Sequence, residues 1–159
     1  MTKPDPGSSS MPQNHNHDGR VHRHRVVVQW GDTDPAKIVF YPNYFAWFDE
    51  STRGLFDSAG LDWDLLMDRY GVVGVPLVTA SATFRRPAVF RDSLTVESSI
   101  SGWNDTTFVV THHVLRDHTL IAEGTETRVW ATPHPDDPKR LRPTPIPPEI
   151  VAAFTVDGA

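Results

Sequence analysis

Apolar and polar side chains alternate along much of this chain, and the alternation predicts β-strands. In the first such stretch, Val26, Val28 and Trp30 alternate with Val27 and Gln29. The other stretches lie in the second half of the chain. Because consecutive strands joined by short turns pair antiparallel, the last three should form a meander. The predicted strands cover residues 26–30, 77–84, 94–100, 107–115 and 120–131.

A spacing of three to four residues marks one long helix between the first two strands. We expect it to begin near Pro42 and Asn43, because proline suits the first helical position and asparagine suits a cap. Gly60 stands where a left-handed residue commonly ends a helix. A second short helix or a turn is expected at 61–70, and a short helix at 149–154. The apolar stripe of the long helix comprises Tyr44, Phe48, Thr52, Leu55 and Ala59.

One long helix beside an antiparallel sheet is an α+β arrangement. Residues 1–20 contain almost no large apolar groups and are expected to be a disordered tail before one domain, residues 21–159. After Ala131 the chain is rich in proline and is not expected to form regular sheet. Sheet edges and the apolar Trp103 should be covered by a second subunit.

Histidines cluster in and just after the expected tail. They alternate with other residues but lack a frame of carboxylates or thiolates, so incidental polarity is favoured over a metal site. We therefore expect no bound metal. The histidines are His15, His17, His22 and His24.

The amino-acid composition further limits the kinds of partner and site that the protein can have. The net charge of −5 argues against nucleic acid, whose phosphates need a concentrated cationic face. The absence of cysteine excludes disulfides, zinc–thiolate sites and cysteine nucleophiles. No apolar run approaches the ~20 residues that span a bilayer, and the start of the chain lacks the apolar segment of a signal peptide. The expectation is a cytoplasmic protein without a membrane partner.

The loop before the long helix carries the most suggestive chemistry. Asp32 and Asp34 stand two residues apart, just before the helix entrance. A carboxylate is charged at neutral pH, so it can attack a carbonyl or activate water without first losing a proton. On spacing alone, a turn or capping role before Pro35 is the better interpretation of Asp34.

Two runs in this loop are more specific, Asp-Thr-Asp-Pro-Ala at 32–36 and Ile-Val-Phe-Tyr-Pro-Asn-Tyr at 38–44. Through them the chain resembles the 4-hydroxybenzoyl-CoA thioesterase family, which has the hot-dog fold. The Tyr-Pro-Asn-Tyr sequence points toward the aryl-CoA branch of that superfamily. The resemblance covers roughly residues 26–154, and its other matching positions are Trp47, Asp49, Arg53, Phe56, 74–76, 82–84 and 92–96.

The resemblance implies one long helix wrapped by a five- to six-stranded antiparallel sheet. It also implies a homodimer paired edge to edge, further assembled as a dimer of dimers, with the active site between subunits. The family's essential carboxylate corresponds to Asp34, which leaves Asp32 as a loop hydrogen bonder. The backbone N–H of Tyr41, at the helix start, is the expected donor to the thioester oxygen.

The substrate would be an acyl-CoA, so coenzyme A enters as part of the substrate and no cofactor is expected. Trp47 and Trp63 are candidates for an aromatic pocket, although core packing is an equal alternative for each. Asp49 is a candidate acceptor for a ring hydroxyl, as the resemblance suggests, or else part of a solvated helix face.

The phosphates of coenzyme A need cations, and here the chain departs from the family. Asn-Asp-Thr at 104–106 replaces a basic run in the turn after a tryptophan. The cations expected instead are Arg85, Arg86, Arg128 and Arg142, each of which is also an ordinary surface charge. Lys37 stands where the family usually has glycine, so a left-handed backbone there would strain it.

Three functions stay open. The first is hydrolysis of an aryl-CoA such as 4-hydroxybenzoyl-CoA, and the second is the same chemistry on an aliphatic or carrier-protein thioester. The third is a non-catalytic acyl-CoA-binding module on the same fold, against which Asp34 and its helix entrance argue. A serine hydrolase is disfavoured because the chain has no Gly-x-Ser-x-Gly.

Overall fold

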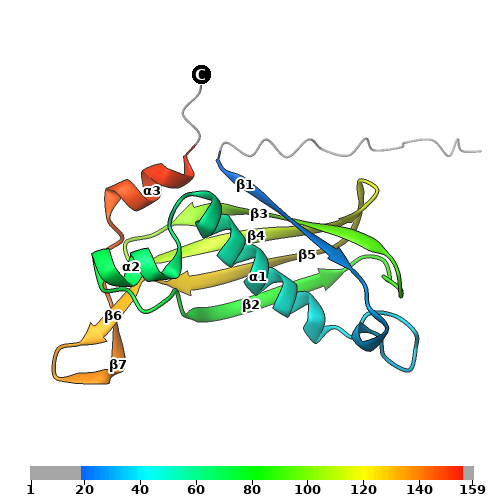
Figure 1. Ribbon diagram of the computed structural model, residues 1–159, viewed down its shortest axis with the longest axis horizontal. Helices are drawn as coiled ribbons and strands as arrows, with labels where there is room; N and C mark the ends of the chain where they lie inside the picture. Colours follow the sequence, from blue (N-terminus) through cyan, green and yellow to red (C-terminus); the bar gives the residue numbers. More distant parts are fainter. Residues whose placement is uncertain (1–18, 156–159) are drawn as a thin grey trace, which may run out of the picture.

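The structure, a computed structural model, describes residues 19–155. Its centre is a five-stranded antiparallel sheet in the order β1-β3-β4-β5-β2. One long helix, α1, crosses one face of the sheet, so that sheet and helix form two layers (Figure 1). The α+β fold and the meander are confirmed. The strands are β1 (Val21–Val27), β2 (Leu77–Phe84), β3 (Ser93–Trp103), β4 (Thr107–Arg116) and β5 (Thr119–Val129).

Helix α1 (Pro42–Ser58) begins at the proline and ends as the sequence predicts. Its predicted apolar stripe faces the sheet, and Phe48 and Leu55 are fully buried. Phe48 rests directly on β5 at Gly124, where a Cβ would meet the ring at 2.5 Å. Beyond the helix, Gly60 has φ +73° and the N–H of Leu61 donates to the carbonyl of Phe56, which is a left-handed termination.

The shorter elements occupy the two ends of α1. A 3₁₀ turn, η1 (Trp30–Asp32), precedes the loop that leads into α1. Helix α2 (Trp63–Tyr70) starts where the Asp62 side chain accepts a hydrogen bond from the N–H of Leu65 at 2.9 Å. Together with α3 (Pro148–Phe154) it closes the far end of the core (Figure 1).

The first strand differs from its prediction. It ends at Val27 rather than Trp30, and it starts earlier, at Val21. Its first half alternates histidine and arginine, which hides it from a search for apolar alternation. An edge strand tolerates such charges because one of its edges faces no other strand. Within residues 19–155, β1 is such an edge strand and pairs with β3 alone.

The proline-rich segment was expected to contain no regular sheet, and that prediction is wrong. Strands β6 (Ala131–His134) and β7 (Asp137–Pro143) form a two-stranded antiparallel ladder. Proline removes a hydrogen bond only where its nitrogen faces the partner strand. In a two-stranded ribbon each strand has a free edge, so prolines such as Pro133 and Pro143 can be accommodated.

Trp103 was expected to need a second subunit as cover. Its ring packs instead within the chain, 5.5 Å from the ring of Phe108 and 5.7 Å from that of Phe154. Helix α3, at the end of the chain, therefore provides the cover. A residue supplied from so far along the sequence leaves no local pattern beside the tryptophan.

The histidines divide between two regions. His15 and His17 lie outside the described residues, whereas His22 and His24 lie on β1. The Nε2 atom of His24 is 3.2 Å from a carboxylate oxygen of Glu50. Among residues 19–155, no three histidine, aspartate or glutamate side chains gather in a way that would hold a metal ion. Within the same range, no helix has the length and apolar character to cross a membrane.

Candidate active site

The loop that carries Asp34 is a tight turn closed by backbone hydrogen bonds. The N–H of Lys37 donates to the carbonyl of Asp34 at 2.8 Å, and the N–H of Asp34 donates to the carbonyl of Ile38 at 2.9 Å. One carboxylate oxygen of Asp34 accepts from the N–H of Ala36 at 2.8 Å. The turn therefore fixes the direction of the carboxylate and leaves its second oxygen for other contacts.

Asp32 holds the same loop from the other side. Its side chain accepts a hydrogen bond from the N–H of Gln29 at 2.7 Å. Its carbonyl accepts from the N–H of Phe40 at 2.8 Å and from the side-chain amide of Asn43 at 2.9 Å. These contacts agree with a loop-stabilising role for Asp32 and separate it from Asp34.

The backbone N–H of Tyr41 sits at the entrance of α1, at the N-cap position. Tyr41 has helical backbone angles, and the first helical hydrogen bond runs from the N–H of Asn43 to the carbonyl of Phe40 at 3.0 Å. Nothing in the described part of the chain accepts a hydrogen bond from Tyr41 N–H. A helix start presents such amides together with the positive end of the helix dipole.

Asp34 and Tyr41 open onto one pocket of about 630 Å³. Its walls are mostly apolar, with Val39, Tyr44 and Ala88 buried beneath it. Burial raises the pKa of the Tyr44 phenol, so this wall stays uncharged. The lining residues are Asp34, Ile38, Val39, Tyr41, Tyr44, Phe84, Arg85, Arg86, Pro87 and Ala88.

The predicted aromatic and acidic contacts lie outside this pocket. Trp47 is buried behind the pocket wall, with its ring 5.2 Å from that of Tyr44. Trp63 packs against Phe56, 5.1 Å between ring centres, in the core cluster near the other end of α1. Asp49 lies on the surface of α1. Among the predicted site residues, the structure thus brings Asp34, Tyr41, Arg85 and Arg86 together at this pocket, and it pairs Asp49 with Arg128 away from it.

The four predicted cations have different surroundings. Arg85 is exposed and pairs with Glu123, and Arg86 is exposed beside the carbonyl of Leu120. Arg142 is exposed on β7. Arg128 is not the surface cation that the sequence suggested, because it is only 6% exposed and its charge is met by carboxylates.

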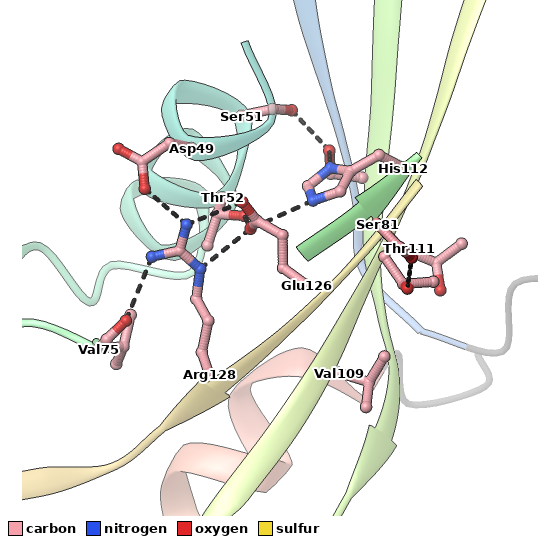
Figure 2. Close-up of polar contacts among 12 residues, drawn as sticks. Asp49, Ser51, Thr52, Val75, Ser81, Val109, Thr111, His112, Glu126 and Arg128 are labelled. Carbon is pink, nitrogen blue, oxygen red and sulfur yellow. Dashed lines mark hydrogen bonds and ion pairs between the residues drawn. The ribbon is translucent and has the colours of Figure 1, made fainter. Parts of the chain in front are cut away.

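The structure also contains a buried polar network that sequence reasoning missed (Figure 2). Glu126 accepts a hydrogen bond from the hydroxyl of Thr52 at 2.8 Å, and Nε2 of His112 lies 3.3 Å from the same oxygen. Nδ1 of His112 lies 2.6 Å from the hydroxyl of Ser98, which in turn lies 2.6 Å from that of Ser51. All five side chains are buried. The available signal was Thr52 within the apolar stripe of α1, a polar residue that needs a buried partner.

The two titratable side chains that face each other in this network, Glu126 and His112, each keep one charge state at neutral pH. Although burial opposes ionisation, contacts with His112 and Arg128 lower the pKa of Glu126 from its ordinary 4.5 to about 2. Burial lowers the pKa of His112, more than the neighbouring Glu126 raises it. At neutral pH we therefore have an ionised Glu126 beside a neutral His112.

Lys37 has the left-handed backbone that the family's usual glycine at this place suggested, with φ +64°. A residue with a Cβ atom pays roughly 1–2 kcal/mol at this backbone angle, and glycine avoids that cost. Part of the gain is lost because glycine also gives the unfolded chain more conformational freedom. We expect Lys37→Gly to raise the free energy of unfolding by about 0.5–1 kcal/mol, measured by urea denaturation. Lys37→Ala, which removes the charge but keeps the strain, should give no such gain.

Comparison with known proteins identifies the fold family. Residues 28–154 match the model of the thioesterase-like superfamily. The 4-hydroxybenzoyl-CoA thioesterase of Pseudomonas sp. (strain CBS-3) is 36% identical over 130 residues, which are 78% of this chain and 90% of that protein.

Two solved structures agree with that match. A mutant 4-hydroxybenzoyl-CoA thioesterase complexed with 4-hydroxybenzoyl-CoA aligns with a TM-score of 0.77 and 34% identity, over 84% of this chain and 98% of that one. A gentisyl-coenzyme A thioesterase aligns with a TM-score of 0.69 and 35% identity, over 83% of this chain and 98% of that one. The chain therefore belongs to the thioesterase-like superfamily and is a thioester hydrolase.

Proposed function

We propose that this acyl-CoA thioesterase hydrolyses an aromatic acyl-CoA, 4-hydroxybenzoyl-CoA or a close aryl-CoA, to the free acid and coenzyme A. The observation that carries the proposal is the pairing of Asp34 with the N–H of Tyr41 on one apolar pocket. A carboxylate and a hydrogen-bond donor at one site are what acyl transfer requires. The similar proteins named for 4-hydroxybenzoyl-CoA and gentisyl-CoA support an aryl substrate.

Asp34 acts on the thioester carbonyl in one of two ways. As a nucleophile it forms a mixed anhydride and expels the coenzyme A thiolate, and water then hydrolyses the anhydride. As a general base it takes a proton from the water that attacks the carbonyl. In both routes the developing oxyanion is stabilised by the Tyr41 N–H, and the thiolate leaves without a strong general acid.

Trp47, Trp63 and Asp49 belong to the proposal as contacts of the aryl group. Because Trp63 and Asp49 lie outside the Asp34 pocket of their own protomer, such contacts must be made with a substrate in the pocket of a second copy. A homodimer, further paired as a dimer of dimers, is therefore part of the proposal.

Strand β2 supports such an assembly. It is an edge strand whose residues are almost all exposed, including Leu77 at 50%, Val78 at 56% and Phe84 at 47%. An exposed apolar edge readily pairs with another strand. Pairing of two β2 edges would continue the sheet between protomers and cover these side chains.

Arg85, Arg86 and Arg142 are the proposed contacts of the coenzyme A phosphates. The first two lie at the rim of the pocket, and all three are exposed. Arg128 is left out because it is buried and paired. Coenzyme A is part of the substrate, and the proposal includes no cofactor. It does include the cytoplasmic location expected from the sequence.

A release assay for free thiol tests the substrate class. We expect the largest kcat/KM with 4-hydroxybenzoyl-CoA or a neighbouring aryl-CoA, lower values with phenylacetyl-CoA, and the lowest with short aliphatic CoA esters. A preference for aliphatic or carrier-protein thioesters would overturn the aryl assignment. Binding of acyl-CoA without thiol release from any ester would contradict catalysis itself.

A further inference from the structure

Asp49 is an exposed carboxylate held by a buried arginine. The Asp49 side chain is 69% exposed, whereas that of Arg128 is 7% exposed. Nη2 of Arg128 donates to one Asp49 oxygen, Oδ1, at 2.5 Å (Figure 2). An exposed aspartate on a helix normally chooses among rotamers, so this bond selects one of them.

Arg128 is itself fixed on several sides. Its Nε and Nη2 donate to the two oxygens of Glu126, each at 3.0 Å, and its Nη1 donates to the carbonyl of Val75 at 3.2 Å. The guanidinium therefore joins β5, the segment before β2 and α1. Because the guanidinium is planar, these bonds set the direction in which it meets Asp49.

The support continues inward. The hydroxyl of Thr52 on the helix donates to the Glu126 carboxylate, and Nε2 of His112 on β4 lies 3.3 Å from the same oxygen. A chain of buried side chains thus runs from the core to a single exposed carboxylate (Figure 2). One arginine faces two carboxylates, Glu126 and Asp49, so the group retains a net negative charge at the surface of α1.

We infer that Arg128 is a positioning residue that sets the acyl-group specificity of the enzyme by orienting Asp49. With Oδ1 committed to Arg128, Oδ2 is the oxygen that accepts a hydrogen bond from a ring hydroxyl of the substrate. Orientation before binding removes the cost of ordering the carboxylate when substrate arrives. This inference rests on the proposed function, and specifically on contact between Asp49 and a hydroxylated ring.

The test compares two substrates that differ only in the ring hydroxyl. Arg128→Lys keeps a buried positive charge for Glu126 but cannot reproduce the fork that reaches Asp49 as well. We expect the ratio of kcat/KM for 4-hydroxybenzoyl-CoA to that for benzoyl-CoA to fall by about tenfold to a hundredfold. A loss of this size is typical when a group that contacts the substrate is moved out of position. Most of the fall should come from the hydroxylated substrate, a change that general loosening of the fold would not produce.

Four further variants complete the design. Arg23→Lys alters an exposed pair with Glu97 and should leave the ratio unchanged. Asp49→Asn should lower the ratio as Arg128→Lys does, and the double variant should lower it no further, because both changes remove one contact. If Arg128→Lys does not fold, the Arg128→Gln, Glu126→Gln pair removes both buried charges and is expected to lower the ratio in the same way.

The outcomes separate this inference from the proposed function. If the wild-type protein prefers the hydroxylated ring and Asp49→Asn loses that preference, a folded Arg128 variant with an unchanged ratio overturns the inference alone. If the wild-type protein hydrolyses both esters equally, the Asp49 contact is absent and the inference falls with it, while the assignment of an aryl-CoA substrate stands. Thioesterase chemistry at Asp34 would still stand in either case.

Discussion

Replacement of Asp34 by Asn is expected to lower kcat for aryl-CoA hydrolysis by about 10²–10⁴-fold. The amide neither attacks a thioester nor takes a proton from water, whereas its oxygen can still accept the hydrogen bond from Ala36 N–H that shapes the turn. The loop should therefore keep its form while the chemistry stops. Thiol release measures the loss. Titration of the slow variant with the substrate itself, followed by tryptophan fluorescence, should show binding close to that of the wild-type protein.

Asp32→Asn is the matched control, since it makes the same change two residues away. Its amide oxygen can still accept from the N–H of Gln29, so only a small loss of kcat is expected. Normal turnover by the Asp34 variant, or an equal loss in both, would contradict the role assigned to Asp34.

The second large effect concerns stability and comes from Glu126→Ala. The change leaves Arg128 without its main buried partner and removes the acceptor of the Thr52 hydroxyl. Breaking a buried ion pair on one side typically costs about 3–5 kcal/mol, because a charge is left uncompensated. That is a large part of the roughly 5–15 kcal/mol that keeps a domain folded. Urea denaturation at neutral pH measures the loss.

Glu97→Ala provides the comparison. Because Glu97 pairs with the exposed Arg23, this change should lower the free energy of unfolding by no more than about 1 kcal/mol.

The pH dependence of stability in acid supplies a second check. Because the folded protein lowers the pKa of Glu126 to about 2 from 4.5, its contribution should be lost as pH falls through that interval. The lowered pKa of His112 acts in the same direction from about pH 6.5 downward. In Glu126→Ala the part of the slope below pH 4.5 should shrink, and an equal slope in both proteins would argue against this network.

Much of the fold was predictable because one face of each main element is buried. Alternation located β2 to its end residues and found β3, β4 and β5 within a few positions. The spacing of Phe48 and Leu55 located α1. The two failures lie where burial does not govern the pattern. The start of β1 is a charged edge strand, and the β6–β7 ribbon lies outside the main core.

In the candidate site, too, some neighbouring residues could be predicted from local sequence and others could not. Asp34 and Tyr41 are seven positions apart in one loop, so local sequence was enough to predict that they lie together. The partners of Arg128 come from residues far apart in the chain, such as Asp49 and Glu126. Nothing in the residues next to an arginine distinguishes a buried, paired side chain from one that awaits a phosphate. Contacts of that kind appear only when the tertiary structure is known.

Helix α1 also links the position of the loop at its start to the core contacts along its length. Phe48 packs against Gly124, and the hydroxyl of Ser51 is hydrogen-bonded to that of Ser98, so a screw motion of the helix along the sheet would break both contacts. A shift by one residue would move its start by about 1.5 Å and turn it by about 100°. The position of the Tyr41 amide along the helix axis, and the direction in which it points, are therefore set by core contacts that lie about two to three turns further along α1. Activity should consequently disappear in step with melting of the core, and no earlier, when the protein is heated.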